Sequence, residues 1–442
     1  MHHLVIGIGE LAHLDDGTNG LICGEKMTNE ENLISKGMGL LIKNGLISKI
    51  SPEEEMIEEF LPSFNYNEIS KYTNKVTNFN IEGINVTHTG GHSVIPGLID
   101  GHTHLLWSGD RSNEVSLRMK GMSYSDISAA GGGISYTVNE TRKASDEVLK
   151  TLGERRLKEA LRNGTTAIEA KSGYGLSTES ELRLTSIMND LAVNKNNPSI
   201  DITWMGAHDI PPGKEDKNKI KSDYIEDIIN AQIPEIVEQG YARSCDVFCE
   251  PGWFSIEETE RIIDTASNAG LSIRLHIDEF MDGSGADLAA IKGVDTADHA
   301  LYSNEEGRHN MAKSNVIQGF LPGAAYTMGL SKWPPMKHCI ENNQPWTIAT
   351  DFNPNCRILS MPSIGSICVQ KLGINPLAVL CAATRNAGES VVHRTEKPHG
   401  IIKNGYVANL NIVNGSNWEG WCLQQGSSPF KATILEGETV IH

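Results

Sequence analysis

The sequence predicts an α/β protein, a (β/α)8 TIM barrel with a small flanking β-sandwich domain built from both termini. Three observations lead to this prediction. Short apolar segments alternate with helical patterns through the middle of the chain. Both ends instead contain short strands joined by tight turns. The length of 442 residues and the hydrophobic fraction of 39% suffice for one large barrel and an accessory domain.

The barrel prediction depends on eight apolar segments that are rich in β-branched residues. They are near-continuous apolar runs rather than alternating patterns, as expected for parallel strands buried on both faces. A doubly wound open sheet is the alternative, but it would require a glycine-rich fingerprint after its first strand, and none is there. The eight segments begin at Ser93, Thr165, Asp201, Cys245, Leu271, Val294, Asn315 and Pro345.

Helix signals separate most of these segments. Ser255 and Glu258 form a capping-box signature ahead of apolar positions, and Thr178 and Glu181 form another. A third helical pattern runs into Asn163-Gly164, a typical C-terminal stop. These signals favour the strand–helix alternation of a barrel.

The two ends of the chain have hairpin signatures. Asn44-Gly45 separates two apolar runs, and Asn404-Gly405 precedes a second group of short strands. We expect these ends to pair into one small β-domain. His2 and His3 match no motif, and we expect them to be surface residues.

These signals divide the chain into three parts. Residues 1–92 form the N-terminal part of the β-sandwich domain, residues 93–390 the barrel, and residues 391–442 the C-terminal part of the sandwich. An acidic, Asn-rich stretch at about 52–80 is interpreted as a solvated surface insertion.

The composition excludes some partners. The formal net charge is −18 and the pI is near 5.3, so the chain lacks the basic surface that binds nucleic acid, and an anionic membrane would repel it. No run of about 18 apolar residues occurs, and the start has no secretory pattern. The eight cysteines are scattered without a CxxC pair, which is typical of reduced thiols. We therefore expect a cytoplasmic protein.

Two histidines, His102 and His104, follow the first predicted strand. Residues two apart in a strand face the same side, so both imidazoles would point into the barrel and could share one metal ion. They lie at the C-terminal end of the strand, where barrel active sites are assembled. Such a pair alone is often a chance pair, but the preceding Val-Ile-Pro-Gly-Leu-Ile-Asp run makes it more specific.

Other predicted strands end in polar residues of the same kind. His208 ends the third strand, His276 the fifth, His299 the sixth and Asp351 the eighth. Polar groups gathered on one face of a barrel are costly to desolvate unless they bind something. Three histidines and a carboxylate suit Zn²⁺, Fe²⁺ or Mn²⁺, and such a metal would lower the pKa of water. Glu279, just past a strand end, could move a proton near that water.

These residues match a known family. The segments VIPGLIDGHTH, HIDE, ADH and TDFNP, in this order, resemble the amidohydrolase superfamily. More narrowly, the chain resembles the imidazolonepropionase family from about residue 95 to residue 387, and related deaminases lack its KSGYG and GDR segments. The residues that carry the narrower match are Gly109-Asp110-Arg111, Gly131-Gly132-Gly133-Ile134, Glu169-Ala170-Lys171-Ser172-Gly173-Tyr174-Gly175, Gly206-Ala207-His208 and Asp246-Val247-Phe248-Cys249-Glu250.

The resemblance implies a hydrolase that acts on carbon–nitrogen bonds of cyclic amides. It would open the ring of 4-imidazolone-5-propanoate, a small-molecule substrate, to N-formimidoyl-L-glutamate in histidine degradation, as a homodimer with one zinc or iron ion per chain. The implied metal ligands are His102, His104, His276 and Asp351. The implied catalytic residues are Glu279, His299 and Asp351. The implied substrate-binding residues are Arg111, Tyr174, His208, Glu279 and Asn353, with Arg111 suited to the propionate carboxylate.

The chain departs from the family pattern at Asn355-Cys356, where many bacterial relatives have glycine and a small hydroxyl residue. We therefore assign these two residues no substrate contact. The glycine run at residues 131–133 is interpreted as a flexible flap rather than a plain turn, and it lacks the Gly-Lys-Ser/Thr of a phosphate loop. Two alternatives stay open: another cyclic amidohydrolase or aromatic deaminase of the superfamily, and a non-catalytic amidohydrolase-like binding protein.

Overall fold

A computed structural model describes residues 2–63, 74–122, 126–127, 130–213 and 215–442. The chain divides into two compact units. The first unit contains Met1–Asp100, Glu159–Ala167 and Ser360–His442, and the second contains Gly101–Lys158 and Ile168–Leu359. The domain limits expected from the sequence, after residues 92 and 390, stay a prediction.

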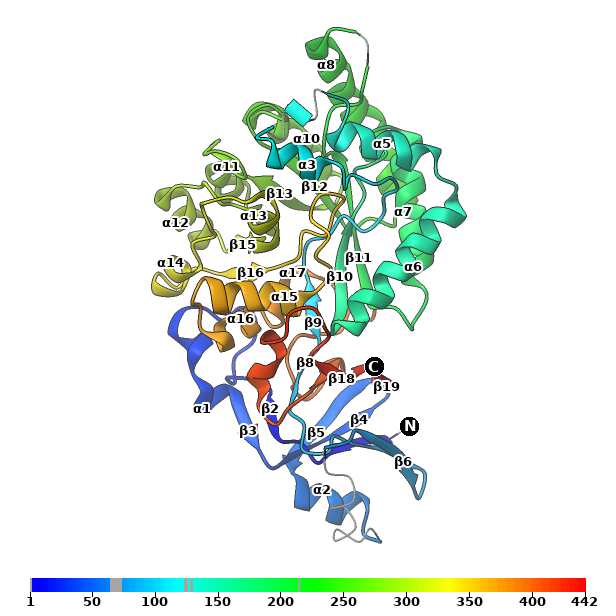
Figure 1. The fold of residues 1–442 in the computed structure, drawn as a ribbon, viewed down its shortest axis with the longest axis vertical. Coiled ribbons are helices and arrows are strands. Elements are labelled where there is room, and N and C mark those ends of the chain that lie inside the picture. Colours follow the sequence, from blue (N-terminus) through cyan, green and yellow to red (C-terminus); the bar gives the residue numbers. More distant parts are fainter. Residues whose placement is uncertain (1, 64–73, 123–125, 128–129, 214) are drawn as a thin grey trace. The chain divides into compact units, whose positions relative to one another are not determined.

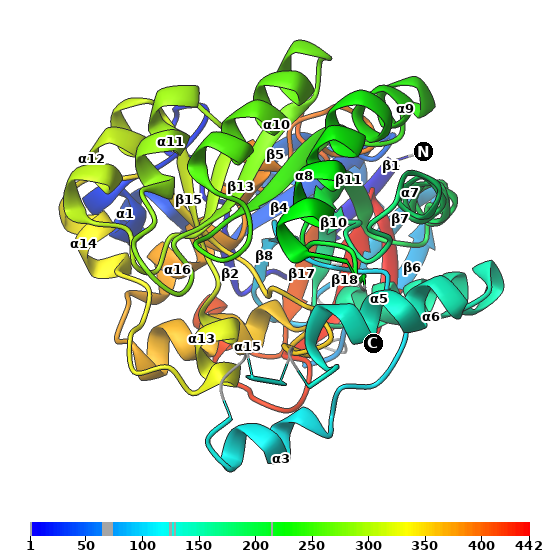
Figure 2. The same ribbon diagram turned by 90° about the horizontal axis from the view of Figure 1, so that it is seen from above.

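An eight-stranded parallel sheet confirms the barrel prediction (Figure 1, Figure 2). All eight apolar segments form strands, and the strands neighbour one another in chain order. Beyond the two outer strands, Thr103 forms a bridge to Phe352, and the His104 amide donates to the Phe352 carbonyl at 2.9 Å, which nearly closes the barrel. The strands are β9 (Leu98–Asp100), β10 (Thr165–Lys171), β11 (Ser199–Ala207), β12 (Ser244–Cys249), β13 (Ser272–Ile277), β14 (Thr296–His299), β15 (Ile317–Phe320) and β16 (Trp346–Ile348).

Helices follow the barrel strands along the chain and lie outside them (Figure 2). The capping box of Ser255 and Glu258 is confirmed at the start of α10, because each residue's side chain accepts from the other's amide. The helices between Gly101 and Leu359 are α3 (Glu114–Met119), α5 (Gly133–Lys143), α6 (Asp146–Arg162), α7 (Thr178–Ala192), α8 (Lys217–Asp227), the π-helical η3 (Ile228–Gln232), α9 (Ile233–Gln239), α10 (Ile256–Asn268), α11 (Gly285–Lys292), α12 (Glu305–Lys313), α13 (Pro322–Met328) and α14 (Met336–Glu341).

The capping box that we expected at Thr178 and Glu181 is wrong. Ser177 caps α7 instead, since its hydroxyl accepts from the amide of Ser180. The Glu181 carboxylate is buried and accepts from loop amides that precede the helix, so tertiary contacts take it away from the local cap.

Two further sheets lie in the first unit, and the six-stranded one combines strands from both ends of the chain, as expected. The five-stranded sheet has the order β5-β4-β1-β7-β6, and the six-stranded sheet has the order β19-β18-β17-β8-β2-β3. Their strands are β1 (His2–Ile6), β2 (Glu10–Ala12), β3 (Ile34–Lys36), β4 (Met38–Lys43), β5 (Leu46–Pro52), β6 (Thr77–Ile81), β7 (Ile84–His88), β8 (Val94–Pro96), β17 (Leu410–Val413), β18 (Phe430–Leu435) and β19 (Glu438–Ile441).

The predicted hairpin at Asn44-Gly45 joins β4 to β5. Both turn residues have positive φ, 52° and 78°, as a type I′ turn requires. Buried residues of both sheets, among them Val5, Leu40 and Ile412, form one apolar cluster. This cluster is the core of the sandwich.

Other short helices complete the first unit. They are η1 (Gly24–Thr28), α1 (Glu30–Leu33), α2 (Glu53–Phe60), α15 (Met361–Ser366), η4 (Ile367–Lys371), α16 (Pro376–Ala383), α17 (Ala387–Ser390) and η5 (Trp418–Cys422). Among the described residues, no helix has the length and apolar character needed to cross a membrane.

Two surface expectations in this unit hold only in part. In the acidic stretch Glu54 and Glu55 are exposed, whereas Glu53 opens helix α2 and is buried, with its carboxylate accepting from the amide of Gly7 at 2.6 Å. Met56 and Ile57 of that helix belong to an apolar cluster with Leu4. Residues 64–73 of the stretch lie outside the described residues. His3 is also buried, because it is part of β1 and hydrogen-bonds to the Gly437 carbonyl and the Thr87 hydroxyl.

The first apolar segment is divided at Gly97. Val94–Pro96 pairs with β17, whereas Leu98–Asp100 belongs to the barrel sheet, so the chain changes sheets at this glycine. A Cβ atom at Gly97 would lie 2.2 Å from the Thr166 hydroxyl oxygen. The close approach of β10 therefore requires glycine here.

We expect Gly97→Ala to destabilise the protein by about 1–3 kcal/mol, because the added methyl group overpacks a buried site. Chemical denaturation would measure the loss of unfolding free energy. Gly415→Ala is the matched control, since a Cβ atom there meets nothing within 4 Å. Equal denaturation midpoints for Gly97→Ala and Gly415→Ala would contradict the steric explanation.

Candidate metal centre and active site

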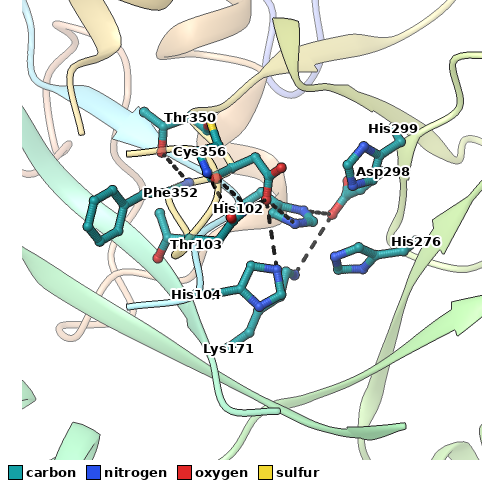
Figure 3. A network of polar contacts seen from close by, with 12 residues as sticks. His102, Thr103, His104, Lys171, His276, Asp298, His299, Thr350, Phe352 and Cys356 are labelled. Atoms are coloured by element: carbon teal, nitrogen blue, oxygen red, sulfur yellow. Dashed lines mark hydrogen bonds and ion pairs between the residues drawn. The ribbon is translucent and has the colours of Figure 1, made fainter. Parts of the chain in front are cut away.

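The four implied metal ligands come together in the second unit (Figure 3). One ring nitrogen each of His102, His104 and His276 lies within 4.8 Å of the others. The Asp351 Oδ1 atom is 3.7 Å from His102 Nε2 and 3.8 Å from His104 Nε2. All four side chains are buried. Residues far apart in the sequence thus converge as predicted.

The backbone explains this convergence. His102 and His104 lie two apart on an extended segment, and the Asp351 amide donates to the His102 carbonyl at 3.1 Å. His299 and Asp351 have left-handed backbone conformations, with φ of 63° and 52°. Such conformations cost non-glycine residues on the order of 1–3 kcal/mol each and concentrate at functional sites.

Two of the histidines are oriented by carboxylates. His102 Nδ1 donates to Asp298 Oδ2 at 2.7 Å, and His276 Nδ1 donates to Asp246 Oδ1 at 3.0 Å. Their Nε2 atoms are buried and have no hydrogen-bond partner among the described residues. In metal sites, a carboxylate commonly accepts a hydrogen bond from the Nδ1 atom of a histidine and so leaves its Nε2 atom available to the ion.

Electrostatics favour a cation in this cluster. Burial and the nearby Lys171 ammonium keep the pKa of His102 well below its usual range, so its ring is neutral. Burial raises the pKa of Asp351 to about 7. A bound cation would oppose that shift and favour the carboxylate. Neutral imidazoles and one carboxylate form a donor set that fits a divalent transition metal.

His299 and Glu279 lie beside the cluster. His299 Nε2 is 3.6 Å from Glu279 Oε2, and both residues line the same cavity as His104, His276 and Asp351. Burial, together with the charges of Asp351 and Glu250, raises the pKa of Glu279 well above its usual range. The raised pKa favours the protonated form of the Glu279 carboxyl group.

The implied substrate-binding residues Arg111, Tyr174, His208 and Asn353 line that cavity too. The His208 ring stacks on the His104 ring with centroids 4.7 Å apart. Its Nδ1 donates to the Gly173 carbonyl at 3.0 Å, and burial lowers the pKa of His208 to about 3. Its Nε2 is therefore a neutral acceptor.

Arg111 is held by a buried carboxylate. Its Nε and Nη2 atoms donate to the two oxygens of Glu114, both at 2.9 Å. Glu114 Oε1 also accepts from the amide of Gly133 at 2.8 Å, where α5 begins. The glycine run therefore forms a turn into a helix and contacts the partner of Arg111, and its role as a flap stays a prediction.

Residues of the loop after β16 orient Asp351 and line the cavity. The Asn353 amide group donates to the Asp351 carbonyl and to Asp351 Oδ1, and Asn353 Oδ1 accepts from the amides of Asn355 and Cys356. Asn353 thereby orients Asp351. Asn355 lines the cavity and accepts from Arg118, whereas Cys356 is buried with its thiol on the Thr350 carbonyl.

Two loop-holding carboxylates were missed by the sequence reasoning. Glu181 accepts from the amides of Gly173, Gly175 and Leu176 at 2.7–2.9 Å, on both sides of Tyr174. Glu250 accepts from the amides of Glu279, Phe280 and Met281 at 2.9–3.1 Å. The signal for Glu250 was its position directly after a predicted buried strand.

A buried lysine beneath the histidines was also missed. Lys171 ends β10 and is fully buried. Its Nζ atom forms ion pairs with Glu169 at 3.0 Å and Asp246 at 2.7 Å. A lysine at the end of a predicted buried strand was the signal that could have identified it.

Several known proteins are similar in sequence to most of the chain, although no family model matches it. An imidazolonepropionase from Alkaliphilus metalliredigens is 38% identical over 330 residues, which cover 74% of this chain and 76% of that protein. An imidazolonepropionase from Geobacillus thermodenitrificans is 34% identical over 423 residues, which cover 95% and 93%.

Solved structures resemble the fold over its whole length. Ochratoxinase from A. niger has a TM-score of 0.66 at 16% identity, with 100% of this chain and 95% of that chain covered. A mutant of atrazine chlorohydrolase from Arthrobacter aurescens, complexed with zinc and atraton, has a TM-score of 0.62 at 12% identity, with the same coverage. At these identities the likeness concerns the fold alone.

Proposed function

The chain belongs to the imidazolonepropionase family, and we propose that it hydrolyses 4-imidazolone-5-propanoate to N-formimidoyl-L-glutamate. One observation carries the proposal. A single cavity is lined by the candidate metal ligands His104, His276 and Asp351 and by the guanidinium-bearing Arg111. The cavity thus combines hydrolytic groups with a partner for the carboxylate of the substrate.

His102, His104, His276 and Asp351 would hold one divalent ion, zinc or iron. Such an ion, when bound, lowers the pKa of water and polarises a carbonyl. Two proposals remain: the chain acts in the cytoplasm, as its composition suggests, and as a homodimer, as the family resemblance implies.

Two groups move protons in the proposed reaction. His299 is buried, and burial lowers its pKa well below the usual range, so its neutral ring can accept a hydrogen bond from the attacking water. The raised pKa of Glu279 favours its protonated form, and the side chain lines the same cavity, so it can donate to the ring nitrogen that leaves. Together they provide a hydrogen-bond acceptor for the water and an acid for the leaving nitrogen.

Other groups bind and orient the substrate. Arg111 lines the cavity and is oriented by Glu114, so its guanidinium group would bind the substrate carboxylate there. His208 Nε2 can accept from an N–H of the imidazolone ring, because Nδ1 is committed to a carbonyl. Tyr174, on the loop that Glu181 holds, contributes a ring to the same cavity wall.

The direct test is turnover. Purified protein with a measured metal content should remove imidazolone propionate, followed by the loss of its absorbance. A protein that contains metal and turns over a dihydropyrimidine or an aminopyrimidine, but leaves this substrate unchanged, would overturn the proposal.

Arg111→Ala is expected to raise KM for the propionate substrate by about 30- to 1000-fold, because one partner of a buried charged pair is lost. An analogue without the carboxylate should be affected much less. Since Glu114 is then left unpaired, Arg111→Ala with Glu114→Gln tests the same contact without a buried orphan charge. Arg357→Ala is the control, because that arginine is exposed and pairs with Asp110. Equal losses for both substrates would remove Arg111 from the carboxylate site.

A further inference from the structure

Lys171 lies under the histidine cluster, and we propose that its ammonium group is the shared anchor of the two carboxylates that orient the metal-binding histidines. It would thus be a positioning residue that sets metal affinity and geometry. This inference rests on the metal site proposed above, and it adds a residue to which none of the predicted roles was assigned.

Each histidine is linked to the lysine through one carboxylate, and Figure 3 shows the link through Asp298. Asp246 places Oδ1 on His276 Nδ1 at 3.0 Å and Oδ2 on Lys171 Nζ at 2.7 Å. Asp298 places Oδ2 on His102 Nδ1 at 2.7 Å and on Lys171 Nζ at 3.9 Å. A displacement of the Lys171 ammonium group would therefore change the orientation of both the His102 and the His276 ring.

A third contact ties Lys171 to the His102–His104 segment. Lys171 Nζ is 3.0 Å from Glu169 Oε1, while Glu169 Oε2 accepts from the amide of Thr103 at 3.3 Å. The Lys171 amide donates to the Thr103 carbonyl at 2.9 Å. Thr103 is the residue between the two histidines, so the lysine and its partners also hold the backbone that carries them.

The charges of the cluster are consistent with this role. An isolated buried ammonium group would be costly, and its carboxylate partners offset that cost. Three buried carboxylates, those of Glu169, Asp246 and Asp298, lie within 3.9 Å of the one Lys171 ammonium group.

The alternative is that Lys171 only stabilises the fold. A stabilising ion pair would change the unfolding temperature of the metal-free protein but not the affinity of the folded protein for metal. An anchor of the ligands would change the affinity and the coordination geometry. The two roles therefore differ in measurements that do not involve turnover.

The test compares Lys171→Met with the unchanged chain by chelator competition for Zn²⁺ and by the absorption spectrum of the Co²⁺-loaded protein. We expect zinc affinity to fall about 10- to 100-fold, the usual effect of losing a group that orients metal ligands, and the cobalt spectrum to change. Lys292→Met is the control, because Lys292 forms its ion pairs with Glu260 and Asp264 on the helical surface. Its affinity and spectrum should equal those of the unchanged chain.

Three further variants keep the test decisive. If Lys171→Met does not fold, Lys171→Met with Glu169→Gln removes one charge of each sign and leaves the net charge unchanged. Asp246→Asn should weaken zinc binding, and adding Lys171→Met should weaken it less than the two separate effects predict, because both act on His276.

The outcomes separate this inference from the proposed function. A folded Lys171 variant with unchanged zinc affinity and cobalt spectrum overturns the anchor role alone. If the unchanged chain itself binds no metal, the proposed metal site fails as well.

Discussion

His104→Ala is expected to abolish metal binding and hydrolysis together. The substitution removes one of the three clustered imidazoles and leaves two histidines and Asp351. Without the ion, water keeps a pKa roughly 8 units higher than near a catalytic metal, so activity should fall by more than about 10⁴-fold. Elemental analysis and turnover of the same preparation would measure both losses.

Thermal unfolding provides a third readout of the same variant. Ligand binding to the folded state stabilises it by about 4 kcal/mol at a free concentration of roughly 1,000 times Kd. Added metal should therefore raise the Tm of the unchanged chain and not that of His104→Ala. His309→Ala is the control, because His309 is an exposed residue of α12. A His104 variant that retains one metal per chain would rule out this ligand assignment.

The barrel strands could be predicted from the sequence because parallel strands buried on both faces leave apolar runs that are visible without neighbours. The ends of those strands then placed His102, His276 and Asp351 on one face. The division of the first segment at Gly97 was not visible, because the reason for it is the distant Thr166 side chain.

The groups that support the site could not be predicted in the same way. Glu181 has the spacing of a capping-box residue. In the folded chain its buried carboxylate instead accepts from three loop amides, and the local sequence does not show this contact. Lys171 was visible within a motif, yet its role depends on carboxylates from two other strands. Periodicity reports which face a residue occupies and not which buried charges meet there.

The second large effect is expected from Glu279→Gln, which removes the proposed acid but keeps the shape of the side chain. Glu279 lines the cavity, and the amides around it stay anchored on Glu250 in the variant. We expect kcat to fall by about 10²- to 10⁴-fold, the usual contribution of a positioned acid. Metal content should not change, which distinguishes this variant from His104→Ala.

The pH dependence follows from the raised pKa of Glu279. A general acid acts while it holds its proton, so its contribution to kcat is lost as pH rises through the pKa of the folded protein. The unchanged chain should show this alkaline loss of kcat, and Glu279→Gln should not. A variant that keeps full kcat, or the same alkaline loss, would show that another group supplies the proton.

The Glu279→Gln substitution should raise the stability of the metal-free protein although it lowers activity. Above the pKa of the unfolded state, the folded chain binds the Glu279 proton more tightly than the unfolded chain does, so stability falls as pH rises towards the folded pKa. Glutamine carries no such ionisation. Metal-free Glu279→Gln should therefore be more stable than the metal-free unchanged chain at neutral pH, and this advantage should disappear as pH falls below the unfolded pKa of the glutamate. Chemical denaturation at several pH values would measure it, and an advantage that does not depend on pH would mean that the buried proton of Glu279 is not its cause.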